Sequence, residues 1–330
     1  MLRRALSYGF RFIVRGRNRL YERGFFLPKS TEVPVISVGN IVAGGTGKTP
    51  VTLLLAERLL KDVRVGIVSR GYLSEAEKRK EPLLVSKGAG PLYPPEKCGD
   101  EVFLLSSRLP EAIVVAGKDR IKAANMAADA GAEVVILDDG MQHRRIARDI
   151  EIVVVNGHDP YGGGYFLPRG SLRDDPKRLR EADLIVINGG EEIENNFPQV
   201  VVENRPQKVF FSDGKEIDIA EKSCVGVFCG IANPDRFVQA VERMGCKVVE
   251  THFVADHRKI GNRELMNFSS RAKERGAELL LCTEKDAVKG LSFSKSALPI
   301  GWVKSGLVIK KNQKGWEELV AKVKKLIGES

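Results

Sequence analysis

Residues 35–49 read VISVGNIVAGGTGKT, and this stretch decides the fold. An apolar strand is expected over residues 33–38, a glycine-rich turn follows it, and residues 49–60 are expected to form a helix. A strand, a glycine-rich turn and a helix in this order can surround phosphate with backbone N–H groups, helped by the helix N-terminus. The strict pattern has glycine at position 42, where this chain has Val42, and a plain glycine-rich turn is the alternative interpretation.

Within this loop, Lys48 is expected to reach the β- and γ-phosphates of a nucleotide, and the Thr49 hydroxyl is expected to bind Mg²⁺. The residues predicted to surround the phosphates are Val42, Ala43, Gly44, Gly45, Thr46, Gly47, Lys48 and Thr49.

A second apolar strand, VVILDD over residues 134–139, ends in two aspartates. A carboxylate at such a strand end holds Mg²⁺ or its water, and Asp138 is assigned that role. A turn or helix-capping aspartate is the alternative. Together the loop and the acidic strand end predict an enzyme or switch that uses a nucleoside triphosphate.

Strands and helices alternate along the rest of the chain. The pattern predicts a P-loop NTPase-like α/β fold with a doubly wound, mostly parallel sheet over residues 25–205. From about residue 205 the alternation restarts, which predicts a second, smaller α/β domain over 206–330 that closes the cleft. The segment 73–97 is charged and then proline-rich, and is expected to be a long excursion from this fold.

The composition limits the class of protein. Of 330 residues, 43% are apolar and 29% charged, as in a globular chain of about two domains. No apolar run approaches the roughly 18–20 residues that cross a bilayer. Five cysteines without a zinc-like spacing fit a reduced, cytoplasmic protein. Lys and Arg number 53 against 43 Asp and Glu, a net charge of +10 that indicates an anionic partner.

Residues 1–24 contain seven arginines and one acidic residue, Glu22. At about 100° per residue, the apolar side chains share one arc and most of the arginines lie opposite, which predicts a basic amphipathic helix. Two interpretations stay open, and both can hold for different parts of the helix. It packs on its own domain, or it faces an anionic membrane surface.

The sequence resembles the tetraacyldisaccharide 4′-kinase family, the lipid A 4′-kinases. The resemblance spans nearly the whole chain, in the family's order of motifs, and the family also usually lacks glycine at the position of Val42. The matching segments are VISVGN (35–40), GGTGKTP (44–50), SRGY (69–72), GDE (99–101), KDR (118–120), LDDGMQH (137–143), RD (148–149), LPRGSLR (167–173), DH (256–257) and TEKDAVK (283–289).

This resemblance implies transfer of the γ-phosphoryl group of ATP, with Mg²⁺, to the 4′-hydroxyl of an acylated glucosamine disaccharide 1-phosphate. Asp100 is then the proton acceptor, paired with His257 across the interdomain cleft, and Asp139 joins them among the catalytic residues. From the residues alone, Asp100 also fits a helix N-cap and His257 also fits a surface loop.

The resemblance also raises four further residues to phosphate-contacting candidates. Arg120 and Arg173 are chosen as clamps because guanidinium binds phosphate oxygens in a bidentate manner. Gln142 and His143 follow the acidic strand end, where ligands bind in doubly wound sheets, and a structural role is their alternative.

The alternative function is a partitioning-type P-loop ATPase switch at a membrane surface. The signature lysine of that class precedes the first glycine of the loop, and here Ala43 occupies that position. A nucleic-acid partner is not expected, since no zinc pattern or aromatic RNA-binding motif occurs, and no protein partner is predicted. The expected location is the cytoplasmic face of the inner membrane, bound peripherally through residues 1–24.

Overall fold

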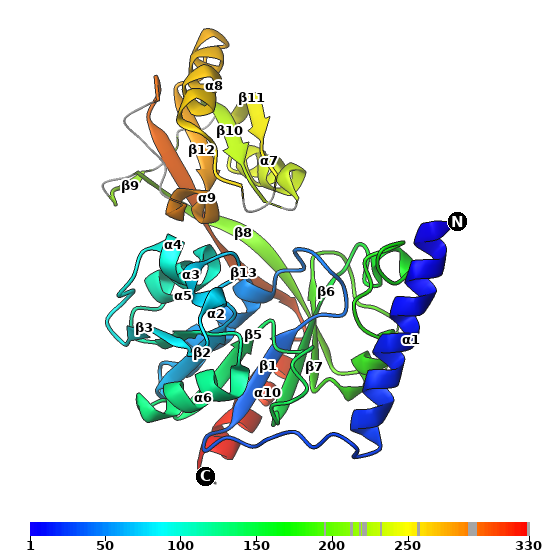
Figure 1. Cartoon of the computed structure of the whole chain (residues 1–330). Coiled ribbons are helices and arrows are strands. Elements are labelled where there is room, and N and C mark those ends of the chain that lie inside the picture. Colours follow the sequence, from blue (N-terminus) through cyan, green and yellow to red (C-terminus); the bar gives the residue numbers. More distant parts are fainter. Residues whose placement is uncertain are drawn as a thin grey trace. The chain divides into compact units, whose positions relative to one another are not determined.

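Strand β1, Val35–Gly39, carries the glycine-rich loop and lies within the main sheet of the computed structural model. The structure describes residues 1–194, 196–211, 214–217, 219, 223–231, 233–255, 258–289 and 296–328. Contacts within the chain define two compact units. Unit 1 comprises Met1–Glu203 with Leu307–Ser330, and unit 2 comprises Asn204–Gly306 (Figure 1).

The sheet of unit 1 has the strand order β8-β7-β6-β1-β5-β2-β4-β3. Its neighbouring strands are parallel, except that β3 runs antiparallel to β4. The strands besides β1 are β2 (Val65–Ser69), β3 (Leu83–Lys87), β4 (Ile113–Ala116), β5 (Val134–Asp138), β6 (Ile150–Asn156), β7 (Leu184–Asn188) and β8 (Gln199–Phe211). The register aligns Val38 with Asp138, which brings the acidic end of β5 beside the start of the loop.

Helices cover both faces of this sheet. Those of unit 1 are α1 (Leu2–Glu22), α2 (Lys48–Leu59), α3 (Glu75–Lys78), α4 (Pro95–Cys98), α5 (Asp100–Arg108), α6 (Arg120–Asp129) and α10 (Gln313–Gly328), with the 3-10 turns η1 (Gly162–Gly164) and η2 (Pro176–Glu181). Side chains from α2, α5 and α10 pack on one face, and those from α6 and α1 on the other. Residues 35–39, 65–69 and 134–138 are buried throughout, as expected for parallel strands covered on both faces.

Unit 2 repeats this layered arrangement on a smaller scale. Its strands β10 (Cys224–Cys229), β11 (Lys247–Phe253) and β12 (Leu279–Thr283) are parallel, and β9 (Glu216–Ile217) pairs with β8. Helix α7 (Pro234–Arg243) packs on one face of its sheet and α8 (Asn262–Glu274) on the other. These arrangements confirm the predicted fold class of a doubly wound, mostly parallel sheet with a second α/β unit.

The segment 283–289 contacts the loop that follows β10 in unit 2. Helix α9 (Glu284–Val288) contains Asp286, whose carboxylate accepts hydrogen bonds from Gly230 N and from the Lys289 ammonium, both at 2.9 Å. Lys289 also donates to Gly230 O at 3.0 Å. Because both charged side chains are buried and paired, this family motif fixes the loop after β10.

The division into units differs from the predicted domains at the C-terminus. The sequence pattern places residues 206–330 together, whereas the structure returns to unit 1 along β13 (Ile300–Lys311) and ends in α10. Trp316, Leu319 and Val323 of α10 join the same core as α2. Strand β3, which lies within the segment 73–97, strand β13 and the first part of β8 were not expected from the sequence. The half-exposed, charged centre of β8 explains why its pattern is hard to recognise.

Helix α1 forms as expected, and the face that packs against unit 1 is not the apolar arc. The residues fully buried on it are Ser7, Val14 and Asn18. The predicted apolar arc stays largely in solvent: Leu2, Leu6, Ile13 and Leu20 are exposed, and Phe10 alone is partly buried. The helix therefore packs through one face and presents an unpaired apolar face. Among the described residues, no helix is both long and apolar enough to cross a membrane.

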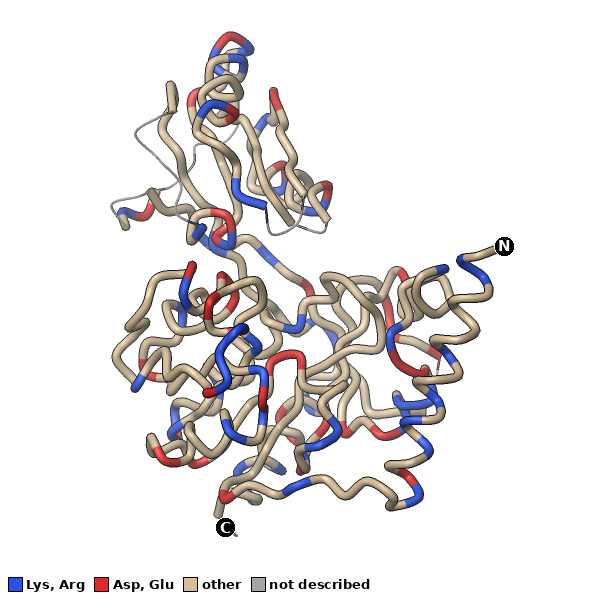
Figure 2. Tube along the Cα trace, viewed as in Figure 1, with Lys and Arg blue, Asp and Glu red and all other residues tan. Residues whose placement is uncertain are grey.

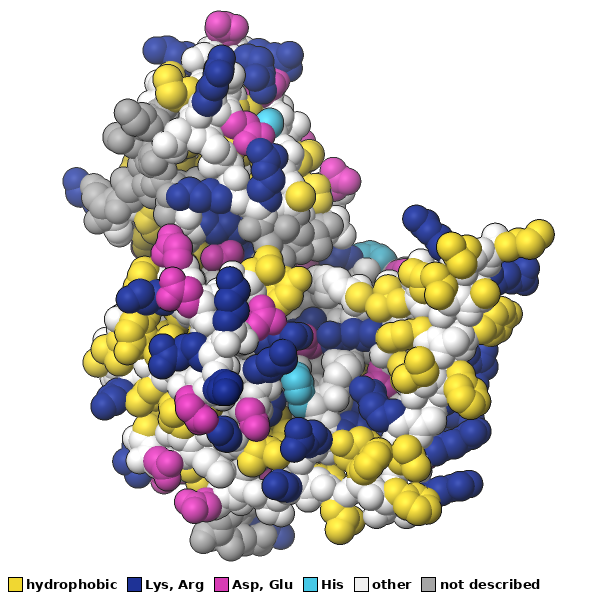
Figure 3. All heavy atoms as spheres, viewed as in Figure 1, with side chains coloured by type: hydrophobic (Ala, Val, Ile, Leu, Met, Phe, Trp, Pro, Cys, Tyr) yellow, Lys and Arg dark blue, Asp and Glu magenta, His cyan; other side chains and the backbone are white. Residues whose placement is uncertain are grey.

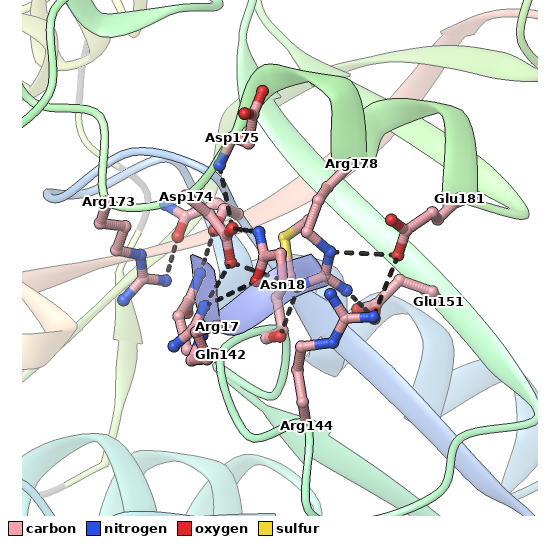
Figure 4. A network of polar contacts seen from close by, with 12 residues as sticks. Arg17, Asn18, Gln142, Arg144, Glu151, Arg173, Asp174, Asp175, Arg178 and Glu181 are labelled. Carbon is pink, nitrogen blue, oxygen red and sulfur yellow. Dashed lines mark hydrogen bonds and ion pairs between the residues drawn. The ribbon is translucent and has the colours of Figure 1, made fainter. Parts of the chain in front are cut away.

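A buried polar network attaches α1 to the rest of unit 1 (Figure 4). Asn18 donates to Asp174 at 2.8 Å, and Arg178 donates to Asp174 at 3.2 Å and to Met141 O at 3.0 Å. Asp174 and Arg178 are almost completely buried, and Arg178 also pairs with Glu151. Charges buried this deeply are tolerated because each is paired and hydrogen-bonded.

Candidate nucleotide and phosphoryl-transfer site

The loop between β1 and α2 has the backbone conformation that its glycines allow. Gly44 and Gly47 have φ angles of 112° and 97°, which residues with a side chain rarely adopt. Gly47 is the N-cap of α2, and the helix begins at Lys48. The N–H groups of the first helical turn have no partner within the helix, so they and the helix dipole favour an anion at this point.

Two asparagines hold the loop in shape. Asn40, fully buried at the end of β1, donates to the Thr46 hydroxyl at 2.9 Å and accepts from Arg173. Asn188, at the end of β7, donates to Thr46 O at 2.9 Å. A Cβ on Gly47 would lie 2.3 Å from the Asn188 amide nitrogen, so this glycine is needed for the close approach.

Asp138 lies where Thr49 can share a cation with it. Its carboxylate accepts hydrogen bonds from the hydroxyls of Thr49 at 3.3 Å and Thr52 at 3.1 Å. Burial, and then the charges of the nearby Glu101 and Asp139 carboxylates, raise the pKa of Asp138 to about 7. The charged form is therefore poorly stabilised by the protein alone, as expected of a carboxylate that needs a cation.

Asp139 contacts two basic side chains of the site. It accepts two hydrogen bonds from Arg173, one of them at 3.1 Å, and lies 3.7 Å from the Lys48 ammonium. Its φ of 58° is unusual for a residue with a side chain. Burial alone would raise the pKa of Asp139, but the hydrogen bonds from Arg173 and the charges of Lys48 and Arg173 lower it far below its ordinary value.

Arg120 and His143 lie in the same electrostatic environment. Arg120 is the first residue of α6, is almost completely buried, and donates to Gly117 O. Burial lowers the pKa of Arg120 to about 10, although Asp139 and Asp138 oppose the effect. Burial and then the charge of Arg120 lower the pKa of His143 to about 4, so its imidazole is neutral at pH 7.

Three of the predicted phosphate-binding residues serve to support the loop. Val42 is buried in the core and forms a bridge with Leu172, and the Ala43 N–H donates to Ser171 O at 2.7 Å. Gln142 donates to Asn40 O at 2.9 Å. The contacts of Val42 and Ala43 join the loop to the segment 171–173, which carries Arg173.

Asp100 begins helix α5, and Gly99 occupies the N-cap position that the sequence left open for Asp100. The neighbouring Glu101 raises the pKa of Asp138, so the start of α5 faces the acidic end of β5. His257 and Asp256 lie outside the described residues, so the predicted Asp100–His257 pair is not tested by the structure.

The arrangement fits Mg²⁺ bound together with a nucleotide. Magnesium usually takes one or two protein oxygens and completes its shell with phosphate oxygens and water. Thr49 and Asp138 supply such oxygens, and the raised pKa of Asp138 fits a missing positive charge. In the part of the chain that is described, no group of three or more His, Cys, Asp and Glu side chains forms a metal site by itself.

Asn40, Thr52 and Asn188 are functional candidates that the sequence analysis did not single out. Asn40 and Asn188 each follow an apolar strand as its terminal polar residue, and that position was the available signal. Thr52 lies one turn after Thr49 on α2, so helical spacing predicts that it points toward the same carboxylate.

A loop at the end of β1, a carboxylate at the end of the adjacent β5 and basic side chains around both define a P-loop, nucleotide-using fold. The comparisons narrow this class. A sequence profile described as tetraacyldisaccharide-1-P 4′-kinase (LpxK) matches residues 1–324. The chain belongs to this family and is an enzyme, a kinase that transfers phosphate to a hydroxyl, which confirms the resemblance seen in its motifs.

Similar proteins agree with this assignment. The chain is 41% identical to the tetraacyldisaccharide 4′-kinase of Chlamydia abortus over 84% of this chain and 78% of that one. It is 36% identical to the enzyme of the same name from Syntrophus aciditrophicus, over 98% and 93%. A crystal structure of "apo" form LpxK from Aquifex aeolicus in complex with ATP has a TM-score of 0.79 and 33% identity, and the match covers 98% of this chain and 99% of that one.

Proposed function

We propose that this protein transfers the γ-phosphoryl group of ATP to the 4′-hydroxyl of a tetraacyldisaccharide 1-phosphate, a step of lipid A synthesis. One structural observation supports the proposal in addition to membership of the family. Lys48, Arg173 and Asp139 form one charged contact beside the Thr49–Asp138 pair, at the end of β1 and β5. Phosphoryl transfer needs little from the protein except positioning and charge stabilisation, and these groups supply both.

The basic side chains stabilise the negative charge of the phosphates. In the absence of nucleotide, Asp139 neutralises Lys48 and Arg173, and bound phosphate oxygens take over these donors. Arg173 can bind them with two N–H groups, whereas Lys48 acts as a point charge. Bound Mg²⁺ would neutralise further charge on the β- and γ-phosphates, held by Thr49 and Asp138.

Asp100 is proposed as the acceptor of the hydroxyl proton, with His257 as its partner. Replacing Asp100 with Ala should lower kcat and leave the KM for ATP nearly unchanged. The His257→Ala change should act in the same direction, and the double variant should lose less than the product of the single losses because the pair acts together. Fully multiplicative losses would contradict the pairing.

Helix α1 supports a peripheral membrane location, proposed as the cytoplasmic face of the inner membrane. Acyl chains of the acceptor reside in a bilayer, so the enzyme must work at its surface. Exposed apolar side chains and arginines both lie along α1 (Figures 2 and 3). Each basic residue near an anionic leaflet adds about 1 kcal/mol of attraction, and binding should weaken with salt.

The deciding experiment supplies the purified protein with radiolabelled ATP, Mg²⁺ and tetraacyldisaccharide 1-phosphate in detergent micelles. We expect label in the lipid product, and none when the acceptor or Mg²⁺ is omitted. ATP hydrolysis without labelled lipid would instead favour the nucleotide-switch function.

A further inference from the structure

A second basic site lies in unit 1, between α1 and the segment 164–176. A cavity of about 230 Å³ opens there, far larger than the roughly 30 Å³ that one water takes in the liquid. Its lining includes four arginines and two tyrosines: Arg4, Arg11, Arg15, Arg169, Tyr8 and Tyr165. No acidic residue is among the described residues that line it. We call it the arginine cavity.

The walls of this cavity are fixed by the fold. Ser7 donates to Phe166 O at 2.6 Å, and Arg15 pairs with Asp175 at 2.6 Å. Together with the bond from Asn18 to Asp174, these contacts hold α1 against the segment 164–176 at three points. The cavity is therefore a formed feature and not a gap between loosely placed segments.

The arginines of the cavity are placed so that they can bind one anion together. At about 100° per residue, Arg4, Arg11 and Arg15 lie within about 40° of each other on α1. The Arg169 guanidinium lies over the Tyr165 ring, 3.5 Å from the ring centre, which orients it without neutralising it. Arg15 is paired through Nε only, and within the described chain the side chains of Arg4 and Arg11 have no hydrogen bond or ion pair.

We propose that the arginine cavity binds the phosphate group of a lipid. Clustered guanidinium groups repel one another, so an anion with several oxygens is the natural occupant, and guanidinium binds phosphate oxygens in a bidentate manner. The exposed apolar side chains Leu2, Leu6 and Ile13 on the same helix favour a phosphate that is attached to acyl chains. Two sources share this chemistry: the 1-phosphate of the acceptor, which rests on the proposed function, and the headgroup of an anionic phospholipid.

The test uses two charge-matched double variants of α1. Arg4→Ala with Arg11→Ala removes two arginines of the cavity, and Arg3→Ala with Arg19→Ala removes two that do not line it. Because the side chains of Arg4 and Arg11 make no hydrogen bond or ion pair in the described chain, both variants should melt near the parent temperature.

The first arm measures kinetics in detergent micelles with acceptors that carry or lack the 1-phosphate. If the acceptor is the source, the cavity variant should raise the KM for the phosphorylated acceptor about tenfold. It should leave unchanged the KM for the acceptor without 1-phosphate and the KM for ATP, and the control variant should resemble the parent.

The second arm measures co-sedimentation with phosphatidylcholine vesicles with and without phosphatidic acid. If the headgroup is the source, the cavity variant should lose much more phosphatidic-acid-dependent binding than the control variant, whose loss is limited to the general charge attraction of two arginines. Equal losses for both variants in both arms would show unspecific charge attraction and overturn the proposal. A parent enzyme that phosphorylates neither acceptor would overturn the proposed function. In that case, binding of the variants to vesicles and to acceptor micelles would still test whether the arginine cavity binds lipid phosphate.

Discussion

The phosphate loop and helix α1 are both basic regions of unit 1, yet they place their charges differently. At the loop, Lys48 and Arg173 converge on Asp139, and buried asparagines hold the backbone behind them. On α1, the buried contacts use Ser7 and Asn18, whereas Arg3, Arg4, Arg19 and most of the apolar residues are exposed to solvent. The loop is organised to bind a small anion in one geometry, and α1 is organised to meet a surface.

The largest effect should follow a change at the loop. Lys48→Ala should lower phosphoryl transfer by about 10²–10³-fold, the range found when a donor to transition-state charge is removed. Its melting temperature should stay at the parent value, because Lys48 contacts Asp139 only at 3.7 Å. Lys61→Ala, an exposed lysine after the same helix, is the control, and a folded Lys48→Ala enzyme with near-normal turnover would refute the assignment.

The network behind α1 should instead control stability. Asp174→Ala removes the partner of the buried Arg178, and breaking such a pair costs about 3 kcal/mol of unfolding free energy. Glu181→Ala removes an exposed partner of the same arginine and should cost well under about 1 kcal/mol. Chemical denaturation measures both values, and similar small losses would show that the network contributes little to stability.

Asp138 gives a prediction about pH. Burial raises its pKa from 3.8 to about 7, so the unfolded chain loses this proton near pH 4 while the folded chain keeps it up to about pH 7. The contribution of this group to stability therefore falls as pH rises across that interval. Without nucleotide, the melting temperature of Asp138→Asn relative to the parent should rise by a few degrees between pH 4 and pH 7. A difference that does not change with pH would contradict the buried, proton-holding state.

The two regions also differ in how far the sequence predicts them. The loop and acidic strand end were predictable because the chemistry fixes their spacing: the register then places Asp138 beside the loop as expected. Helical periodicity predicted α1 but not its packed face, since that face uses Ser7 and Asn18, whose hydrogen-bond partners lie more than 150 residues away. Hydrophobicity alone therefore left open which face packs on the domain.

Contacts between residues far apart in the sequence also explain why some site residues were not predicted. Arg173 and Asp139 carried motif signals, and the structure joins them in an ion pair. Asn188 supports the loop from a strand 142 residues after Thr46, and no local sequence pattern predicts that contact. The roles of Asp100 and His257 remain predictions that rest on the family resemblance.

A smaller effect is expected when the support that Asn188 gives to the phosphate loop is removed. Asn188→Ala removes the hydrogen bond to Thr46 O and leaves a gap beside Gly47. The loop should lose order, and the KM for ATP should rise about tenfold, the worth of one buried hydrogen bond. Asn156→Ala is the matched control because Asn156 aligns with Asn188 at the end of β6 and accepts from His158 N instead. Equal KM values for the two variants would show that Asn188 does not position the loop.

The smallest expected effects distinguish the exposed face of α1 from its packed face at two adjacent residues. Ile13 is 68% exposed and Val14 is 5% exposed, so one points to solvent and the other into the core. Ile13→Ala should leave the melting temperature unchanged and weaken binding to anionic vesicles about fivefold, because it removes about 1 kcal/mol of apolar contact with the bilayer. Val14→Ala should do the reverse, lowering the melting temperature without changing vesicle affinity. Co-sedimentation and thermal unfolding of the two variants measure both properties. If Ile13→Ala binds vesicles as well as the parent at equal salt, the exposed apolar face does not enter the membrane, and the helix contributes through its arginines alone.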